Sequence, residues 1–260
     1  MWEQELEACI RACKKAREGI LQVYNTPFEV EIKSDDSPVT IADKNADKLI
    51  RETLHKEFPN YALLTEESED DLSRRKNDYL FIVDPVDGTK DFVARDDEFT
   101  TNIALAYKGE VVVGVVGIPV TGEIYFATKN GGSFYLEEGK KPVQIHVNDK
   151  KKDLTILTSR YHVTKEEEDI IKNHADLITK VEKYGSSIKA CRIAHGKAEI
   201  SYRLGNGTKE WDTAASQIIV LEAGGVFAQP DLSPITYNKE DVYNRKGFII
   251  LNSLDNVIND

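Results

Sequence analysis

The chain has 260 residues, of which 40% are hydrophobic and 30% charged, as is typical of a globular protein with one large domain or two modest ones. Its formal net charge of −11 disfavours nonspecific binding to nucleic acid or anionic membrane, although a local basic pocket or a bound metal can still hold a phosphorylated ligand. Three cysteines without a CxxC pair argue against a disulfide framework, no apolar run approaches the ~20 residues of a membrane span, and no signal-peptide core follows the N-terminus, so we expect a cytoplasmic protein.

The first part of the chain predicts helices packed on an antiparallel sheet. Apolar residues at spacings of three and four predict amphipathic helices at residues 2–24 and 41–58. Short apolar runs predict the strands, and turn signals such as NGG separate the later ones. The predicted strands cover residues 29–33, 61–68, 79–85, 101–107, 110–118, 123–129, 133–137 and 143–147, with a turn at 35–38 and an exposed, charged loop at 68–78.

The polar segment VNDKKKD indicates a boundary near residue 150. After it the pattern alternates between strands and helices. We therefore expect an α+β half at residues 1–150 and a smaller α/β half at residues 151–260. Strands are predicted at residues 154–159, 198–204 and 247–253, and helices at 165–178, 186–196 and 211–225.

Residues 84–92 read DPVDGTKDF and follow the apolar run YLFIV. A strand that ends in Asp84 presents this carboxylate at the sheet edge, and Asp87 follows on the turn. Gly88 permits a tight backbone, and a helix that begins after it offers free N–H groups to an anion. Neighbouring carboxylates repel unless a cation is present, and Mg²⁺ prefers carboxylates, water and phosphate oxygens. The stretch indicates a divalent metal site beside a phosphate cradle, and the alternative is an Asx-Pro turn with solvated acids.

Further acids lie at the ends of predicted elements. Glu66 and Glu67 end a predicted strand, so they would approach DPVD if the two strands are neighbours. Asp212 opens a predicted helix, where an acid also complements the helix dipole. Asp43 fits an S/T-x-x-D helix-cap pattern. Taken singly, each of these acids is explained by local structure.

Taken together, the motifs resemble a known superfamily. SPVTIAD at 37–43, EES at 66–68, DPVDGT at 84–89 and WDTAA at 211–215 occur in order and at suitable separations. The chain is thereby similar to the lithium-sensitive, magnesium-dependent phosphomonoesterases, which include inositol monophosphatase, fructose-1,6-bisphosphatase and the 3'(2'),5'-bisphosphate nucleotidases. The resemblance implies a layered αβαβα sandwich of the inositol monophosphatase type, in which most metal ligands come from the first half.

The resemblance also implies two to three Mg²⁺ ions per site. Two ions close together can clamp the attacking and leaving oxygens of an in-line displacement. Asp43 and Thr89 would position and deprotonate the attacking water, with Glu66 as a third catalytic residue that also supports a looser third ion. The implied metal ligands are Glu66, Asp84, the carbonyl of Val86, Asp87 and Asp212.

Other segments resemble the nucleotidases within this superfamily. DGTKDF matches their DGTK-x-F pattern, TSRYH at 158–162 their SRxH element, and GSSIK at 185–189 their GSSxK element. Lysine and arginine suit a substrate whose second phosphate must be held. Glu210 favours a different substrate, because an acid near the site could accept hydrogen bonds from sugar or inositol hydroxyls. The implied substrate-binding residues are Asp87, Gly88, Thr89, Lys90, His162, Ser186, Lys189, Arg203 and Asp212.

We therefore expect a Mg²⁺-dependent phosphomonoesterase that removes the 3'- or 2'-phosphate of adenosine 3'(2'),5'-bisphosphate by a metal-activated water, with this small molecule as its partner and no obligate protein partner. The alternative on the same fold is an inositol monophosphatase or inositol polyphosphate 1-phosphatase. Haloacid-dehalogenase-type phosphatases carry D-x-D-G-T, and the D-x-x-D spacing here departs from that pattern. A binding module without chemistry is disfavoured by the full set of acids. Whether loop 67–78 closes over the site stays open.

Overall fold

The computed structural model describes residues 1–32 and 38–258. Most of the predicted turn at 35–38, including Ser37 of the SPVTIAD motif, lies outside the described residues. Val30–Ile32 (β1) and Pro38–Thr40 (β2) form a two-stranded antiparallel sheet. No helix in the described part of the chain is both long enough and apolar enough to cross a membrane.

A seven-stranded sheet forms most of the first half, in the order β3-β4-β5-β6-β7-β8-β9. Its strands are antiparallel neighbours joined mainly by short turns, except that β3 and β4 run parallel. The parallel pair places the residues after β3 beside the end of β4. The strands are Ala62–Thr65 (β3), Tyr79–Asp87 (β4), Thr100–Tyr107 (β5), Glu110–Ile118 (β6), Glu123–Thr128 (β7), Gly132–Leu136 (β8) and Val143–Ile145 (β9).

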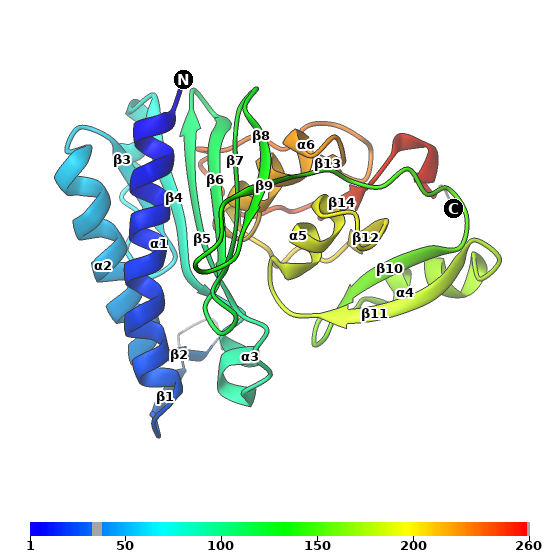
Figure 1. Ribbon diagram of the computed structural model, residues 1–260, viewed down its shortest axis with the longest axis horizontal. Coiled ribbons are helices and arrows are strands. Elements are labelled where there is room, and N and C mark those ends of the chain that lie inside the picture. The colour runs from blue at the N-terminus through cyan, green and yellow to red at the C-terminus, as the bar shows by residue number, and fades with distance from the viewer. Residues whose placement is uncertain (33–37, 259–260) are drawn as a thin grey trace.

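Two helices, Glu3–Tyr24 (α1) and Ile41–Glu57 (α2), cover one face of this sheet (Figure 1). The inner face of α1 carries small residues, including the free thiols Cys9 and Cys13, which are buried at helical spacing. Small side chains let a helix approach a sheet closely, and the two helices pack on Phe81 and Leu105 of β4 and β5.

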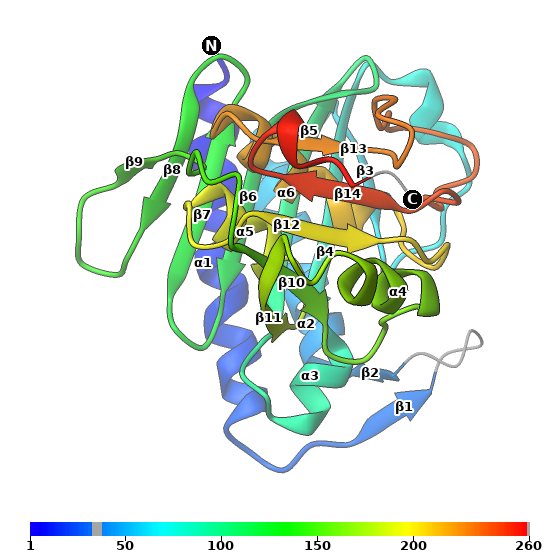
Figure 2. The same cartoon turned by 90° about the vertical axis from the view of Figure 1, so that its right-hand side faces the viewer.

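A five-stranded mixed sheet forms the second half, in the order β11-β10-β12-β14-β13. Lys165–Asn173 (α4) packs on its outer face through Ile170 (Figure 2). Ile188–Ala194 (α5) and Glu210–Glu222 (α6) lie between the two sheets. The predicted αβαβα sandwich is confirmed. The strands are Leu154–Ser159 (β10), Ile178–Tyr184 (β11), Ile200–Arg203 (β12), Val226–Ala228 (β13) and Phe248–Leu251 (β14).

Helix α6 packs closely against the first sheet where β6 carries a glycine. A side chain on Gly114 of β6 would place its Cβ 2.4 Å from the carbonyl oxygen of Ala215 and 2.5 Å from Cγ2 of Ile218. Only glycine permits this approach, so β6 fixes how closely the helix that carries Asp212 lies against the first sheet. Residues 146–153 connect the two sheets, and we propose this connection as the boundary between an N-terminal half (1–150) and a C-terminal half (151–260).

Several predicted elements need correction. The helix predicted at 165–178 ends at Asn173, and the strand β11, which we did not predict, begins at Ile178. The strand predicted at 143–147 ends at Ile145, and β2 and β13 were also missed. The loop at 68–78 is not uniformly exposed, because it contains a short 3-10 helix, Ser73–Lys76, in which Arg74 is buried.

Candidate metal centre and active site

The acids of DPVD lie where β4 departs from regular pairing. Asp84 pairs with Asn102 of β5 and Asp87 pairs with Thr100, and the register shifts between the two pairs. The Asp84 carboxylate accepts a hydrogen bond of 3.1 Å from the backbone N–H of Val86. This irregularity turns both Asp84 and Asp87 toward the C-terminal half, as their proximity to Asp212 shows.

Asp212 comes from the first turn of α6. Its carboxylate accepts a hydrogen bond of 2.7 Å from the backbone N–H of Lys209, which orients it at the start of the helix. Asp84, Asp87 and Asp212 each offer a carboxylate oxygen, and these three oxygens lie within 4.8 Å of one another. The two halves of the chain therefore bring together the three acids that the sequence assigns to a metal site.

Glu66 lies beside this cluster. Its N–H donates to the carbonyl of Val83 at 3.2 Å, one residue before Asp84, as the parallel pairing of β3 and β4 requires. The charge of Glu66 contributes to raising the pKa of Asp84, Asp87 and Asp212, so the fourth acid is in electrostatic reach of the other three.

The electrostatics of the cluster fit a divalent cation. Burial raises the pKa of Asp84 well above its usual range, and the charges of Glu66, Asp87 and Asp212 raise it further. Burial and the charge of Asp87 raise the pKa of Asp212 to about 8. Buried carboxylates that repel one another in this way cannot all be ionised near neutral pH without a compensating charge. Hard oxygen donors of this kind suit Mg²⁺, so the residues present fit the metal that the sequence resemblance implies.

Asp43 and Thr89 form the pair predicted to handle the attacking water. The Thr89 hydroxyl lies 3.2 Å from Asp43 Oδ1 and 3.2 Å from the carbonyl of Val86, so its single hydrogen is donated to one of them at a time. The other oxygen of Asp43 accepts from the N–H and hydroxyl of Thr40, at 2.8 and 2.7 Å. Burial is the main cause of the raised pKa of Asp43.

Two residues of the site were missed from the sequence. Ser187 donates to Asp87 Oδ2 through its N–H at 2.9 Å and its hydroxyl at 3.1 Å, and Asn102 donates to the same oxygen at 3.1 Å. The second serine of GSSIK was the available signal for Ser187, whereas no motif marks Asn102. Together they hold one oxygen of Asp87 and leave the other for a ligand.

The predicted substrate-binding cations also converge. The Arg203 guanidinium donates to the carbonyl of His162 at 2.7 Å. Desolvation of the imidazole and the charges of Lys90, Arg203 and Lys189 lower the pKa of His162 to about 4, so these three cations lie within electrostatic reach of the imidazole. Burial lowers the pKa of Lys189 to about 8, against the opposing effect of Asp87. A half-buried basic group next to the acids suits a second anion near the metal site.

Ser186, Gly88 and Lys90 complete the predicted set. Ser186 has a φ of 47° and donates through its hydroxyl to the carbonyl of Glu98 at 3.2 Å. Gly88 has a φ of 91°, and a Cβ there would lie 3.3 Å from Cβ of Ser186. The DGT turn thus packs directly against the GSS segment. Lys90 is exposed in the first turn of the short helix Thr89–Ala94 (α3).

Glu210 does not fit the role of a residue that binds substrate hydroxyls. It is fully buried, and its two carboxylate oxygens accept from the backbone N–H groups of Asn238 and Lys239, both at 2.8 Å. Both oxygens of Glu210 are thus bound to the backbone of residues 238 and 239, and packing explains why an acid stands at this position.

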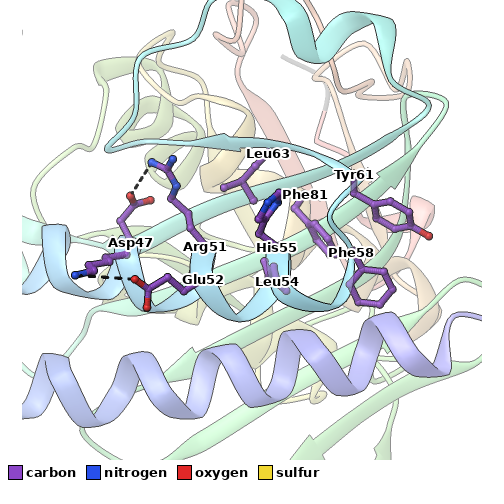
Figure 3. A pocket seen from close by; sticks show the side chains of 10 residues that line it. Asp47, Arg51, Glu52, Leu54, His55, Phe58, Tyr61, Leu63 and Phe81 are labelled. Atoms are coloured by element: carbon purple, nitrogen blue, oxygen red, sulfur yellow. Dashed lines mark hydrogen bonds and ion pairs between the residues drawn. The ribbon is translucent and has the colours of Figure 1, made fainter.

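A cavity of about 470 Å³ lies along α2, apart from the acid cluster (Figure 3). Leu54, Leu63 and Phe81 line its apolar part, and Asp47 and Arg51 lie at its polar end. Asp84, Asp87 and Asp212 are absent from its lining, so its size does not make it the reaction site. The convergence of carboxylates and cations identifies that site better than volume does.

Known proteins are similar to this chain in both sequence and fold. The model of the inositol monophosphatase family matches residues 1–255. The 3'(2'),5'-bisphosphate nucleotidase CysQ of Salmonella typhimurium is 35% identical over 246 residues, which cover 94% of this chain and 98% of the relative. CysQ of Escherichia coli K12 is 34% identical over the same shares of the two chains.

Solved structures agree with these relatives. CysQ from Bacteroides thetaiotaomicron, a bacterial member of the inositol monophosphatase family, has a TM-score of 0.83 and 35% identity, covering 96% of this chain and 97% of its own. The extragenic suppressor protein SuhB from Bartonella henselae has a TM-score of 0.82 and 25% identity, covering 96% and 95%. The predicted family is confirmed by a match over nearly the whole chain, and the protein belongs to the inositol monophosphatase family.

Proposed function

We propose that this protein is a Mg²⁺-dependent phosphomonoesterase that converts adenosine 3'(2'),5'-bisphosphate to AMP and phosphate. The observation that carries the proposal is the group of cations, Lys90, Lys189 and Arg203, that lies around the imidazole of His162 beside the acids. A monophosphate would need the acids alone, whereas a bisphosphate also needs a cationic site for the phosphate that is retained. The CysQ relatives, named as nucleotidases of this specificity, support the same assignment.

We propose two to three Mg²⁺ ions at the acid cluster. Asp84, Asp87 and Asp212 would hold metal from both halves of the chain, and Glu66 and the carbonyl of Val86 would complete the ligand set. When bound, the metal supplies positive charge that neutralises the phosphoryl oxygens and makes a water a usable nucleophile near neutral pH.

In this mechanism the Asp43–Thr89 pair orients the attacking water and accepts its proton. The contact of Thr89 with Asp43 gives the proton a path from the hydroxyl to the carboxylate. The water oxygen forms a bond to phosphorus while the bond from phosphorus to the ribose 3'- or 2'-oxygen breaks. The leaving oxygen takes up a proton from solvent water, and the proton held by Asp43 returns to solvent, which balances the step. Thr40 holds Asp43 in place through two hydrogen bonds.

The remaining phosphate fixes which ester bond reaches the acids. Arg203 offers a planar guanidinium, which donates to the backbone carbonyl of His162 and lies within electrostatic reach of its imidazole. Lys189 is anchored by its Nζ, which donates to the carbonyls of Ser186 and Tyr184 at 2.7 and 3.1 Å. We also propose a cytoplasmic location, on the cysteine usage argued from the sequence.

The test is phosphate release from a substrate panel, with Mg²⁺ and with EDTA. The panel contains adenosine 3',5'-bisphosphate, adenosine 2',5'-bisphosphate, inositol 1-phosphate and 3'-AMP. We expect the highest kcat/KM for a bisphosphate nucleotide, and no release in EDTA. A higher kcat/KM for inositol 1-phosphate would replace the proposal with the inositol monophosphatase alternative.

A further inference from the structure

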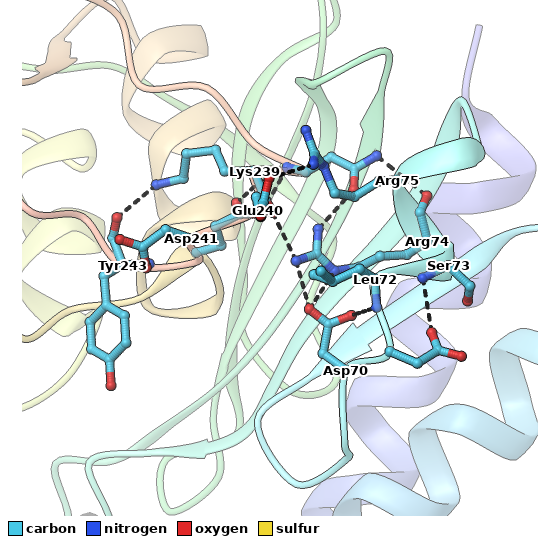
Figure 4. Close-up of polar contacts among 12 residues, drawn as sticks. Asp70, Leu72, Ser73, Arg74, Arg75, Lys239, Glu240, Asp241 and Tyr243 are labelled. Atoms are coloured by element: carbon cyan, nitrogen blue, oxygen red, sulfur yellow. Dashed lines mark hydrogen bonds and ion pairs between the residues drawn. The ribbon is translucent and has the colours of Figure 1, made fainter.

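Two loops from different halves of the chain meet close to the acid cluster. The β3–β4 connection, residues 66–78, begins at Glu66 and contains the buried Arg74. The α6 support loop, residues 237–244, wraps the start of the helix that carries Asp212. Figure 4 shows the polar contacts between these two loops. The first loop thus begins at one predicted metal ligand, and the second binds Lys209 and Glu210, just before another in the sequence.

Arg74 joins the two loops. Its guanidinium holds Asp70 of its own loop with bonds of 3.0 and 2.7 Å from Nε and Nη2. It also reaches the other half, where Nη1 donates to Asn238 Oδ1 at 2.8 Å and Nη2 to the carbonyl of Lys239 at 2.9 Å. The side chain is only 3% exposed, so these bonds are shielded from water and are stronger than surface contacts.

The same two residues of the support loop are bound by α6. Glu210 accepts from the N–H groups of Asn238 and Lys239, and it lies two residues before Asp212. Asn244, further along the loop, donates to the carbonyl of Lys209 at 2.9 Å and accepts from Lys239 Nζ at 3.1 Å. The support loop therefore lies between Arg74 on one side and the start of α6 on the other.

We propose that Arg74 is a positioning residue that sets the spacing between Glu66 in the N-terminal half and Asp212 in the C-terminal half. The relay runs from Arg74 through Asn238 and Lys239 to Glu210. The inference rests on the proposed function of the acids as a metal site and deepens it. It also gives the loop at 67–78 a role as a fixed tie between the halves and not as a closing lid.

The chain supplies a matched control in the next residue. Arg75 also spans the halves, through an ion pair of 3.1 Å with Glu240, but both side chains are exposed, at 45% and 73%. Exposed pairs of this kind contribute little because water and salt screen them. Removing Arg75 changes the charge of the loop by the same amount as removing Arg74 and leaves the relay intact.

The experiment is a calorimetric titration of the metal-free protein with Mn²⁺, with no substrate present. We expect Arg74→Ala to weaken Mn²⁺ binding by about 10- to 100-fold, the range seen when a residue that orients metal ligands is removed. Arg75→Ala is expected to stay within about twofold of the unmodified protein, because an exposed pair is worth so little. A folded Arg74→Ala protein with unchanged affinity overturns the proposal.

Two further variants cover the possibility that Arg74→Ala does not fold. Arg74→Lys keeps the charge but cannot reach all three partners, and Glu210→Gln breaks the relay from the other end. Each is expected to weaken Mn²⁺ binding, and a combined variant is expected to lose less than the product of the single losses, because both act on one relay. Unchanged affinity in either folded single variant, or strictly multiplicative losses, contradicts the relay. If the unmodified protein binds Mn²⁺ but releases phosphate from no substrate, the proposed function is refuted and the role of Arg74 in metal binding is not.

Discussion

At the residue scale, the pKa of Asp212 shows the electrostatic repulsion among the acids of the site. Its carboxyl group has a pKa of about 8 because it is largely desolvated and lies next to the charges of Asp87 and Glu66. An ordinary aspartate in the unfolded chain ionises near pH 4. Between these two values the folded protein holds a proton that the unfolded chain releases, so without metal the folded state loses stability as pH rises from about 4 to about 8.

This loss of stability with rising pH can be measured. In EDTA, we expect the free energy of unfolding to be lower at pH 8 than at pH 6, by about 1 kcal/mol or more, since one pKa unit corresponds to about 1.4 kcal/mol. Asp212→Asn removes the repulsion and should raise Tm at pH 8 by at least 2–4 °C. The control is Asp176→Asn, at an exposed position. Thermal melting that is equally pH-dependent in Asp212→Asn would contradict this explanation.

A second single residue, Arg203, is proposed to determine which substrate is bound. A hydrogen bond to a charged group is worth about 1.5–3 kcal/mol, or about 10- to 100-fold in affinity. We expect Arg203→Gln to raise KM for adenosine 3',5'-bisphosphate by that factor with little change in kcat. For 3'-AMP, which lacks the 5'-phosphate, KM should stay nearly constant. An equal rise of KM for both substrates would show that Arg203 does not read the second phosphate.

At the scale of elements, the first turn of α2 combines a helix cap with a carboxylate that we propose takes part in the reaction. Thr40 caps the helix by accepting from the N–H of Ala42, and its own N–H and hydroxyl donate to Asp43. The capping box that begins the helix thus also fixes the carboxylate that contacts Thr89. One local structure would thus serve both the stability of the helix and the proposed reaction.

The substitution Thr40→Val separates these two roles. It keeps the shape of the side chain and removes the hydroxyl, so it should cost about 1 kcal/mol of stability as a lost cap. We also expect kcat to fall by about tenfold or more, because Asp43 loses a bond that orients it. Ser253→Ala removes a cap of the same kind, which accepts from the N–H of Asp255 near the C-terminus, and should leave kcat unchanged. Unchanged kcat in Thr40→Val would separate the cap from catalysis.

The sequence predicted the elements whose pattern is local. Helix α1 and strands β4 to β8 have clear periodicity, whereas β11 reads ITKVEKY and its largely exposed, charged residues hide a strand that exists because it pairs with β10. In the site, motifs marked the acids, but Asn102 and the buried Arg74 carry no local signal. Arg74 lies among charged residues in SEDDLSRRKND, so only the fold distinguishes it from Arg75.

At the scale of the whole molecule, the acids join two halves that each contain their own sheet. Asp84 and Asp87 come from the first sheet and Asp212 from the helix between the sheets. A ligand that binds only when these acids are together binds the folded state and not the unfolded chain. Metal binding is therefore expected to stabilise the entire protein.

We expect Mg²⁺ at 100 times its Kd to stabilise the fold by about 2.7 kcal/mol, which corresponds to about 5–10 °C in Tm. Differential scanning calorimetry with Mg²⁺ and with EDTA measures this shift. Asp84→Asn should remain folded, lose most of the shift and lose activity by orders of magnitude. A full Mg²⁺-dependent shift in Asp84→Asn would place the stabilising ion elsewhere.

The most direct measurement is anomalous diffraction from crystals of the protein grown with Mn²⁺. We expect a strong anomalous peak bounded by the carboxylates of Asp84, Asp87 and Asp212, at about 2.0–2.3 Å from their oxygens, with Glu66 next to it. Clear density for these side chains with no peak between them, or with the ion bound at a different part of the surface, would contradict the claim that both halves build one metal centre.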